Sequence, residues 1–387
     1  MSLLNHHSIH NFFKDKELNH FYLTIAIITF GEALIGIFVP IYLYKLGYEI
    51  YQILFFYFLL SFYFVIFSYI SAKIVSKIGI KHSILFAMPF LIFYMLGLNF
   101  IESSVVIFFV LPFLLSLGTI LYNYGYHLNF IGHSKRKNRG REISFLGIIT
   151  ILVSMSAPLI GGLIASRSFL FLYITSASIL FLGTIPLFLT KDNRKFLNSN
   201  FEGLFKKIFS KKERGNLISF SGYAIESSIN RILWPIFLII ILLSLEKTGL
   251  VITLSLILSV SGFYIAGNLT DKYNRFKLIK FWTFLHSISW IGRIFADNFF
   301  KIFLVDSYKN ISEKILAVPW EAHSYDLAKR EENYFNFIIR REITFNFARI
   351  IFMPVIILIF YINWHPFTIT FIIAGIASLG YSFINKK

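Results

Sequence analysis

Two glutamates, Glu32 and Glu226, stand in the middle of long apolar stretches, where charged residues are rare. An ionisable side chain in such a stretch is costly and is usually there for function. A carboxyl group shielded from water can take up and release a proton, so both glutamates are candidates for carrying protons. For Glu226 the alternative is a structural pair with Arg231, about one helical turn further along.

A second group of charges, Asp306, Lys309 and Glu313, has i, i+3, i+7 spacing. This spacing places all three on one helical face. Because lipid would reject such a face, we expect it to line an internal cavity, unless these charges only neutralise one another. The other cavity candidates are Asn123, Tyr126, Asn230, Arg231 and Trp320.

Two histidines, His127 and His323, end apolar stretches 196 residues apart. Histidine titrates near physiological pH, so both are candidates for a proton relay or a gate. The alternative is an ordinary hydrogen bond to nearby backbone, or to Glu142 and Glu342. Outside this group we expect Arg293 to pair with Asp297, one turn away.

The composition defines the solvent of this chain. Its 387 residues are 56% hydrophobic and only 15% charged, whereas a soluble domain has about 25% charged residues. The chain therefore needs lipid around it. It has no cysteine, which excludes disulfides and thiolate metal sites. No phosphate-binding loop or catalytic serine elbow occurs, so we expect no enzyme activity, cofactor or metal.

Continuous apolar runs of about 20 residues predict membrane-spanning helices rather than a β-barrel. We place twelve spans, of which the tenth is weakened by its charges. They are 21–44, 51–72, 83–100, 104–125, 143–165, 168–189, 216–243, 249–269, 278–296, 301–322, 336–361 and 366–383.

The basic residues predict the orientation. If the N-terminus lies inside, 28 Lys and Arg residues fall in inner segments and 4 in outer loops. By the positive-inside rule, both termini are then cytoplasmic in a multi-pass protein of the cell membrane. The net charge of +17 is accordingly a signal of topology, and we expect no nucleic-acid partner.

The polar stretch 190–215 divides the chain. It follows a tail (1–20) and a first set of six spans (21–189), and it precedes a second set (216–387). Within it, residues 200–214 would form an amphipathic helix with an apolar face of Phe, Leu and Ile and an opposite face of Lys. Such a helix predicts contact with anionic lipid. A solvated linker is the alternative. We expect a monomer.

The two halves repeat each other at offsets of 194 to 200 residues. The matched pairs are Glu32 and Glu226, Pro40 and Pro235, Ala72 and Gly267, His127 and His323, Arg141 and Arg341, and Pro158 and Pro354.

With this repeat, the chain resembles the major facilitator superfamily of secondary transporters. The family motif G-x-x-x-D-[RK]-x-G-[RK]-x-[RK] matches at Gly267, Asp271, Lys272, Arg275 and Lys277, with Asn274 in place of the glycine. The copy in the first half is degraded, because Ala72 and Ser76 replace its glycine and aspartate. The resemblance implies an all-α membrane fold of twelve helices in two pseudo-symmetric six-helix bundles.

The resemblance also implies a cytoplasmic gate. It places Asp271 near the start of span five, where Arg141 stands, as a latch between the halves. Ser76 could form only a weaker, uncharged contact with the start of span eleven, so we expect two unequal latches. The gate candidates are Ser76, Asp271, Lys272, Arg275, Arg141, Glu142, Arg341 and Glu342.

Span five carries Pro158, Gly161 and Gly162 in A-P-x-x-G-G, similar to a motif of exporters in this superfamily. Helix packing explains these residues equally well. We expect proton-coupled efflux of a small amphiphilic solute by alternating access. Uptake by proton symport, transport of a lipid or lysophospholipid, and a sensor or scaffold that does not transport are the alternatives.

Overall fold

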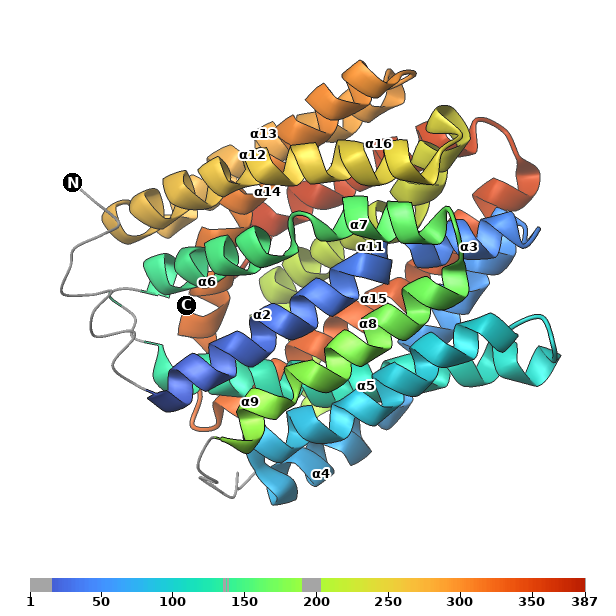
Figure 1. Cartoon of the computed structure of the whole chain (residues 1–387). Helices are drawn as coiled ribbons and strands as arrows, with labels where there is room; N and C mark the ends of the chain where they lie inside the picture. Colours follow the sequence, from blue (N-terminus) through green and yellow to red (C-terminus); the bar gives the residue numbers. More distant parts are fainter. Residues whose placement is uncertain (1–15, 135–136, 138, 190–202, 387) are drawn as a thin grey trace.

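The computed structural model describes residues 16–134, 137, 139–189 and 203–386, and within these residues it contains helices and no strand (Figure 1). The elements are α2 (Lys16–Gly36), α3 (Phe38–Lys45), α4 (Ile50–Gly97), η1 (Leu98–Phe100), α5 (Val105–His133), α6 (Arg139–Ser154), α7 (Ala157–Ala165), α8 (Phe169–Gly183), α9 (Ile185–Phe188), α10 (Leu204–Ile208), η2 (Lys211–Glu213), α11 (Arg214–Leu242), α12 (Leu245–Lys272), α13 (Arg275–Ile294), α14 (Phe299–Ala328), α15 (Tyr334–Ile362), α16 (Pro366–Ser378) and η3 (Leu379–Phe383).

Local sequence explains where these helices begin and break. Six begin after a Ser or Asn whose side chain accepts a bond from a helix N–H: Ser104, Ser168, Ser244, Asn274, Asn298 and Asn333. Three breaks, between α2 and α3, α6 and α7, and α8 and α9, lie just before a proline. Pro40, Pro158 and Pro186 cannot donate the hydrogen bond that would continue the helix.

The helix α4 folds back on itself at Gly79. This glycine has φ 82° and ψ 173°, which is not helical and suits glycine alone. The first part of α4 runs parallel to α5 and the second part antiparallel to it. The contacts are Phe56–Phe108 and Phe67–Phe113 for the first part, and Leu91–Gly118 and Ile84–Gly125 for the second. The two parts correspond to the predicted spans 51–72 and 83–100.

The helices lie roughly along one direction (Figure 1). Among the N-terminal helices (α2–α9), α4 packs on α5 and α2 on α8; among the C-terminal helices (α11–η3), α14 packs on α12 and α13, and α16 on α11 and α13. Between the two sets, α4 packs on α15, α6 and α7 on α12, and α3 on α11. We call the end that carries α10 the linker end and the opposite end the α3 end.

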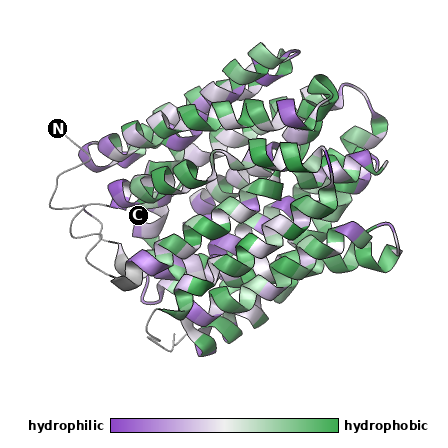
Figure 2. Cartoon of the chain, in the orientation of Figure 1, coloured by the Kyte–Doolittle hydropathy of each residue, from purple (hydrophilic) through white to green (hydrophobic). Residues whose placement is uncertain are grey.

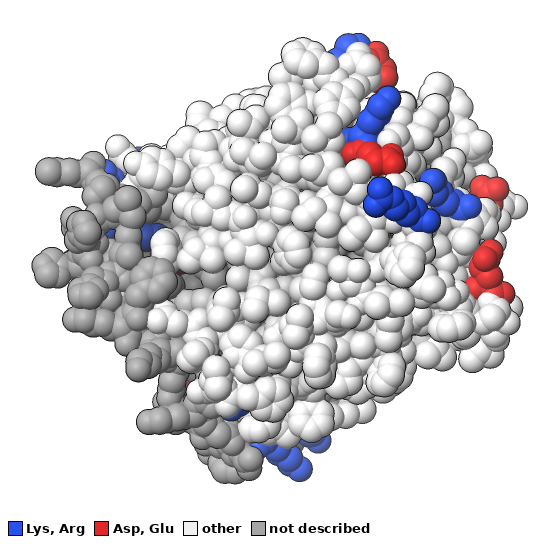
Figure 3. All heavy atoms as spheres, in the orientation of Figure 1, with Lys and Arg blue, Asp and Glu red and all other residues white. Residues whose placement is uncertain are grey.

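The described residues contain nine helical segments that are long and apolar enough to cross a membrane. Hydrophobic residues predominate along the helices, and hydrophilic ones gather toward their ends (Figure 2). On the face drawn in Figure 3, most visible charged side chains lie near the α3 end, and a broad band across the middle shows none. The chain is therefore an all-α, multi-pass membrane protein.

Candidate functional site

Asp271, at the end of α12, binds the N-terminus of α6. Its two carboxylate oxygens accept hydrogen bonds from the backbone N–H groups of Gly140 and Arg141, each at 3.1 Å. The Arg141 side chain lies 3.6 Å from the same carboxylate. The contact that the sequence predicted is therefore present, and it has the geometry of a helix N-cap supplied by a distant helix.

Asp326, near the end of α14, adds a second tie that the sequence did not predict. It forms ion pairs with Arg139 at the start of α6 and with Arg275 at the start of α13, the latter at 2.7 Å. Arg275 also lies 3.6 Å from Asp271. Nothing in the sequence spacing of Arg139 points to Asp326.

The counterpart of Asp271 in the first half makes no such tie. The Ser76 hydroxyl donates to the carbonyl of Lys73 in its own helix at 2.8 Å. The expected contact with the start of α15 is not among the hydrogen bonds of the described residues. Lys272 is exposed. Among the described residues Asp271 therefore joins α12 to α6, whereas the weak contact predicted for Ser76 is absent.

His127 of α5 joins the two sets of helices near the linker end. Arg341 Nη2 of α15 lies 2.8 Å from His127 Nε2, and Tyr325 Oη of α14 lies 2.7 Å from His127 Nδ1. A guanidinium can only donate, so Nε2 must accept and the proton sits on Nδ1. The geometry therefore requires a neutral His127 that donates to Tyr325.

Glu342 of α15 completes this group. Asn123 of α5 donates to it at 3.2 Å, Arg341 lies 3.1 Å away, and His127 lies 3.6 Å away. We call Asn123, His127, Tyr325, Arg341 and Glu342 the polar seam. Tyr126 stacks on Tyr122 beside it, with ring centroids 6.3 Å apart. Glu142, a predicted gate residue, is not a member of the seam.

Glu226 is buried among the C-terminal helices. His286 of α13 lies 3.5 Å from its carboxylate, Lys309 of α14 lies 3.9 Å away, and Tyr381 donates to it at 3.3 Å. Lys309 also pairs with Glu313. Arg231 is not its partner, so the expected pair within one helix is replaced by pairs with neighbouring helices.

Asp306 does not share the surroundings of Lys309 and Glu313. It accepts from Arg293 of α13 at 2.7 Å and from Ser255 of α12 at 2.6 Å, and Arg293 also donates to Asn230 at 2.8 Å. The expectation that one face of α14 lines a cavity is wrong for Asp306, because α12 and α13 cover that position.

Arg293 likewise does not pair with Asp297, as the sequence suggested. It turns inward to Asp306, and Asp297 binds Lys301 at 2.6 Å in an exposed turn. The hydrogen bond from Lys301 lowers the pKa of the Asp297 carboxyl.

His323 and Trp320 of α14 have structural partners. His323 Nε2 donates to the carbonyl of Asn385 at 2.7 Å. Trp320 Nε1 donates to Ser219 at 2.8 Å, and its ring stacks on Tyr223. His323 therefore joins α14 to the segment that follows η3. Trp320 of α14 is buried against α11.

Glu32 lies in the last turns of α2, in the middle of the apolar segment Asn19–Lys45, and has no hydrogen bond or close ion pair to any described residue. It interacts electrostatically with Arg231 of α11 and Tyr122 of α5. Of the two candidate glutamates, Glu32 is therefore the one whose neighbours come from both sets of helices.

The glycines of α7 pack helices together. A Cβ at Gly161 would lie 2.2 Å from the Leu34 carbonyl of α2, and one at Gly162 would lie 2.5 Å from the Leu245 carbonyl of α12. A Cβ at Gly249 of α12 would likewise lie 2.2 Å from the carbonyl oxygen of Pro158. These residues therefore close the α3 end by direct backbone contact.

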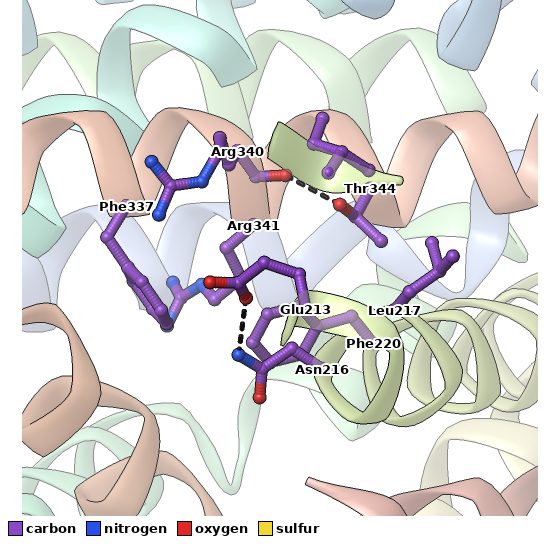
Figure 4. A pocket seen from close by; sticks show the side chains of 9 residues that line it. Glu213, Asn216, Leu217, Phe220, Phe337, Arg340, Arg341 and Thr344 are labelled. Atoms are coloured by element: carbon purple, nitrogen blue, oxygen red, sulfur yellow. Dashed lines mark hydrogen bonds between the residues drawn. The ribbon is translucent and has the colours of Figure 1, made fainter. Parts of the chain in front are cut away.

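The predicted amphipathic helix at 200–214 is not continuous in its described residues, 203–214, because α10 ends at Ile208 and η2 follows. Leu204 and Ile208 are buried against the protein, and Phe205 and Phe209 are exposed. A small pocket lies beside it, lined by α11 and α15 residues that include Asn216 and Arg340 (Figure 4). Its volume of about 10 Å³ admits one water molecule, so it is no substrate site.

A scan against protein-family models and a search of curated proteins found no match to this chain.

Proposed function

We propose that this protein is a proton-coupled secondary transporter of the major facilitator type, in which twelve helices form two six-helix bundles. The helix count is supported by α4, which supplies two crossings, and by α13 and α14. Both are long enough to span but carry charges. Because Arg293, Asp306 and Lys309 are buried against other helices, these charges do not prevent α13 and α14 from crossing the membrane.

The observation that carries the proposal is the character of the contact between the two sets of helices. At the linker end it consists of hydrogen bonds and ion pairs around Asp271, Asp326 and the polar seam. Polar contacts of this kind can be exchanged for water when a gate opens. At the α3 end the contact is close backbone packing at Gly162 and Gly249.

Between these two ends lie Glu32 and Arg231, which stand near the middle of the apolar segments Asn19–Lys45 and Lys211–Leu242 and come from different sets of helices. A midplane site between two bundles that rock against each other is the arrangement of alternating access. Glu32 is our first candidate for the coupling proton, and His127 is the second. Glu226 is a weaker candidate than the sequence suggested, because Lys309 and His286 already pair with it.

The excess of basic residues in the inner loops supports a cytoplasmic position for both termini and for the linker end, in a protein of the cell membrane. Gly161 and Gly162 belong to the one sequence motif that favoured efflux, and close helix packing accounts for both of them. Efflux by antiport and uptake by symport are therefore both consistent with the site.

The test is flux in proteoliposomes across an imposed pH gradient, followed with a trapped pH dye and a panel of amphiphilic compounds and lysophospholipids. Glu32→Gln is expected to abolish the proton-coupled flux while the protein stays folded. Glu102→Gln, in an exposed loop, is the matched control. Coupled flux that survives in Glu32→Gln would remove Glu32 from the mechanism. A wild-type protein that moves no compound of the panel would favour the non-transporting alternative.

A further inference from the structure

Two arginines meet in the middle of the bundle. Arg349, halfway along α15, donates to Ser228 at 3.1 Å and to Ser227 at 3.4 Å, both on α11. Arg231 lies three residues beyond Ser228 on the same helix, which is about one turn. The two guanidinium groups are therefore neighbours, and they interact electrostatically.

Neither arginine has a carboxylate partner among the described residues. The hydrogen bonds of Arg349 go to two serines and to Asn346, all of them uncharged. Arg231 has no hydrogen bond to a described residue, and it is exposed although it lies at the centre of α11. This is unlike the other arginines inside the bundle, since Arg293 pairs with Asp306 and Arg341 with Glu342.

The nearby carboxylates do not cancel this charge. Glu32 interacts with Arg231, and Glu342 interacts with Arg349 at longer range but is already bonded to Arg341. One glutamate against two arginines leaves a net positive charge, whether or not Glu32 carries a proton. Like charges close together repel each other, and a bound anion would relieve that repulsion.

The groups around the arginines suit an organic anion rather than a small inorganic one. The rings of Tyr57 and Tyr223 lie within electrostatic range of Arg231, and Tyr223 stacks on Trp320 with centroids 5.2 Å apart. Tyr122 of α5, stacked on Tyr126, lies within electrostatic range of Glu32, which itself interacts with Arg231. Aromatic walls of this kind bind the apolar part of a ligand, while polar groups fix its orientation.

We propose that Arg231 and Arg349 bind the carboxylate or phosphate group of an amphiphilic organic anion, with the surrounding tyrosines holding its apolar part. Guanidinium groups bind both kinds of anion through paired hydrogen bonds, so the two share one recognition chemistry. The proposal rests on the proposed function for the location of the substrate site.

The experiment measures the melting temperature of the full-length protein in detergent with benzoate, phenyl phosphate or benzamide at constant ionic strength. Benzamide has the shape of benzoate without its charge. Each anion that binds is expected to raise the melting temperature of the wild type, and its apparent affinity is expected to fall about tenfold to hundredfold in Arg231→Gln/Arg349→Gln. Whether benzoate or phenyl phosphate gives the larger shift distinguishes a carboxylate from a phosphate ligand.

Two further variants separate recognition from folding. Arg231→Lys/Arg349→Lys keeps both charges without the paired donors and is expected to bind the anions with intermediate affinity. Lys45→Gln removes an exposed cation elsewhere and is expected to bind as the wild type does. If the response to both anions is the same in the wild type and in the double Gln variant, including no response in either, the proposal is overturned. It is also overturned if benzamide binds as well as benzoate.

Anion binding and transport can fail separately. Binding that depends on the arginines, in a protein that moves nothing across a pH gradient, would overturn the proposed function and leave this site standing. Proton-coupled flux of a neutral compound that is unaffected by the double Gln variant would do the reverse.

Discussion

The helices α5 and α14 hold corresponding places in the repeat, yet their interiors differ. α14 carries Asp306, Lys309 and Glu313, whereas the corresponding stretch of α5, residues 110–118, carries no charge. In α14 these charges pair with one another and with side chains of α11, α12 and α13. The difference teaches that a charge inside a membrane span can serve cohesion within one bundle. If the proposed function is correct, the charges available for transport are those that neither set of helices satisfies alone.

The largest expected effect comes from breaking the buried pair in the C-terminal helices. Arg293→Leu leaves Asp306 as an unpaired buried charge, which costs about 3–5 kcal/mol of stability. Thermal unfolding in detergent measures the loss. Arg293→Leu/Asp306→Leu leaves no unpaired charge and makes this position of α14 apolar, as it is in α5, so it is expected to recover most of the stability. If Arg293→Leu were as stable as the wild type, the buried charges of α14 would not be stabilising the C-terminal helices.

The matched control is the exposed pair Lys301 and Asp297. Both side chains are at least half exposed, so Lys301→Leu is expected to leave the stability almost unchanged. A loss as large as that of Arg293→Leu would show that charge removal alone, and not burial, governs the effect.

The next prediction compares a glycine that packs within the N-terminal helices with one that packs against the C-terminal helices. Gly161→Ala forces a methyl group onto the Leu34 carbonyl of α2 and is expected to cost about 1–3 kcal/mol. In Gly162→Ala the added methyl group meets α12 instead, and in the proposed two-bundle arrangement α12 can move away together with the other C-terminal helices. We therefore expect a smaller loss of stability but greater access to the α3 end, measured by labelling a single introduced cysteine. Equal losses and unchanged access would contradict this distinction.

A smaller effect tests the unequal ties at the linker end. Asp271→Asn keeps the shape of the side chain but removes its charge, and it is expected to weaken the tie to α6 by about 1 kcal/mol, roughly a fivefold shift toward opening. Because the chain has no cysteine, one introduced cysteine near Gly140 reports access without background. Ser76→Ala is expected to change nothing, and a shift of similar size would show that the ties are equal after all.

The smallest effect is a pH dependence of the polar seam. When His127 gains a proton, both ring nitrogens become donors, so it can no longer accept from Arg341. The seam is therefore weaker as pH falls, by about 0.5–1.5 kcal/mol, and cysteine access at the linker end rises. In His127→Gln the amide oxygen still accepts, so this rise is expected to disappear. His323→Gln is the control, since His323 donates and loses no bond on protonation.

The sequence predicted well what depends on local chemistry. Apolar runs of sufficient length predicted a helical membrane protein, and Ser, Asn and Pro marked many helix ends. The motif around Asp271 predicted a contact 130 residues away in sequence, because its carboxylate suits any helix N-terminus that the repeat brings near.

What the sequence determined by itself was therefore the set of helices and the faces of those helices that carry charge. Only the tertiary structure decided which charges meet. In the structure Arg293 pairs with Asp306 rather than with Asp297, and Glu226 pairs with His286 and Lys309. Arg349 lies beside Arg231. The physical reason is that helical periodicity gives the direction of a side chain from its own axis, whereas the neighbour it reaches depends on how separate helices pack.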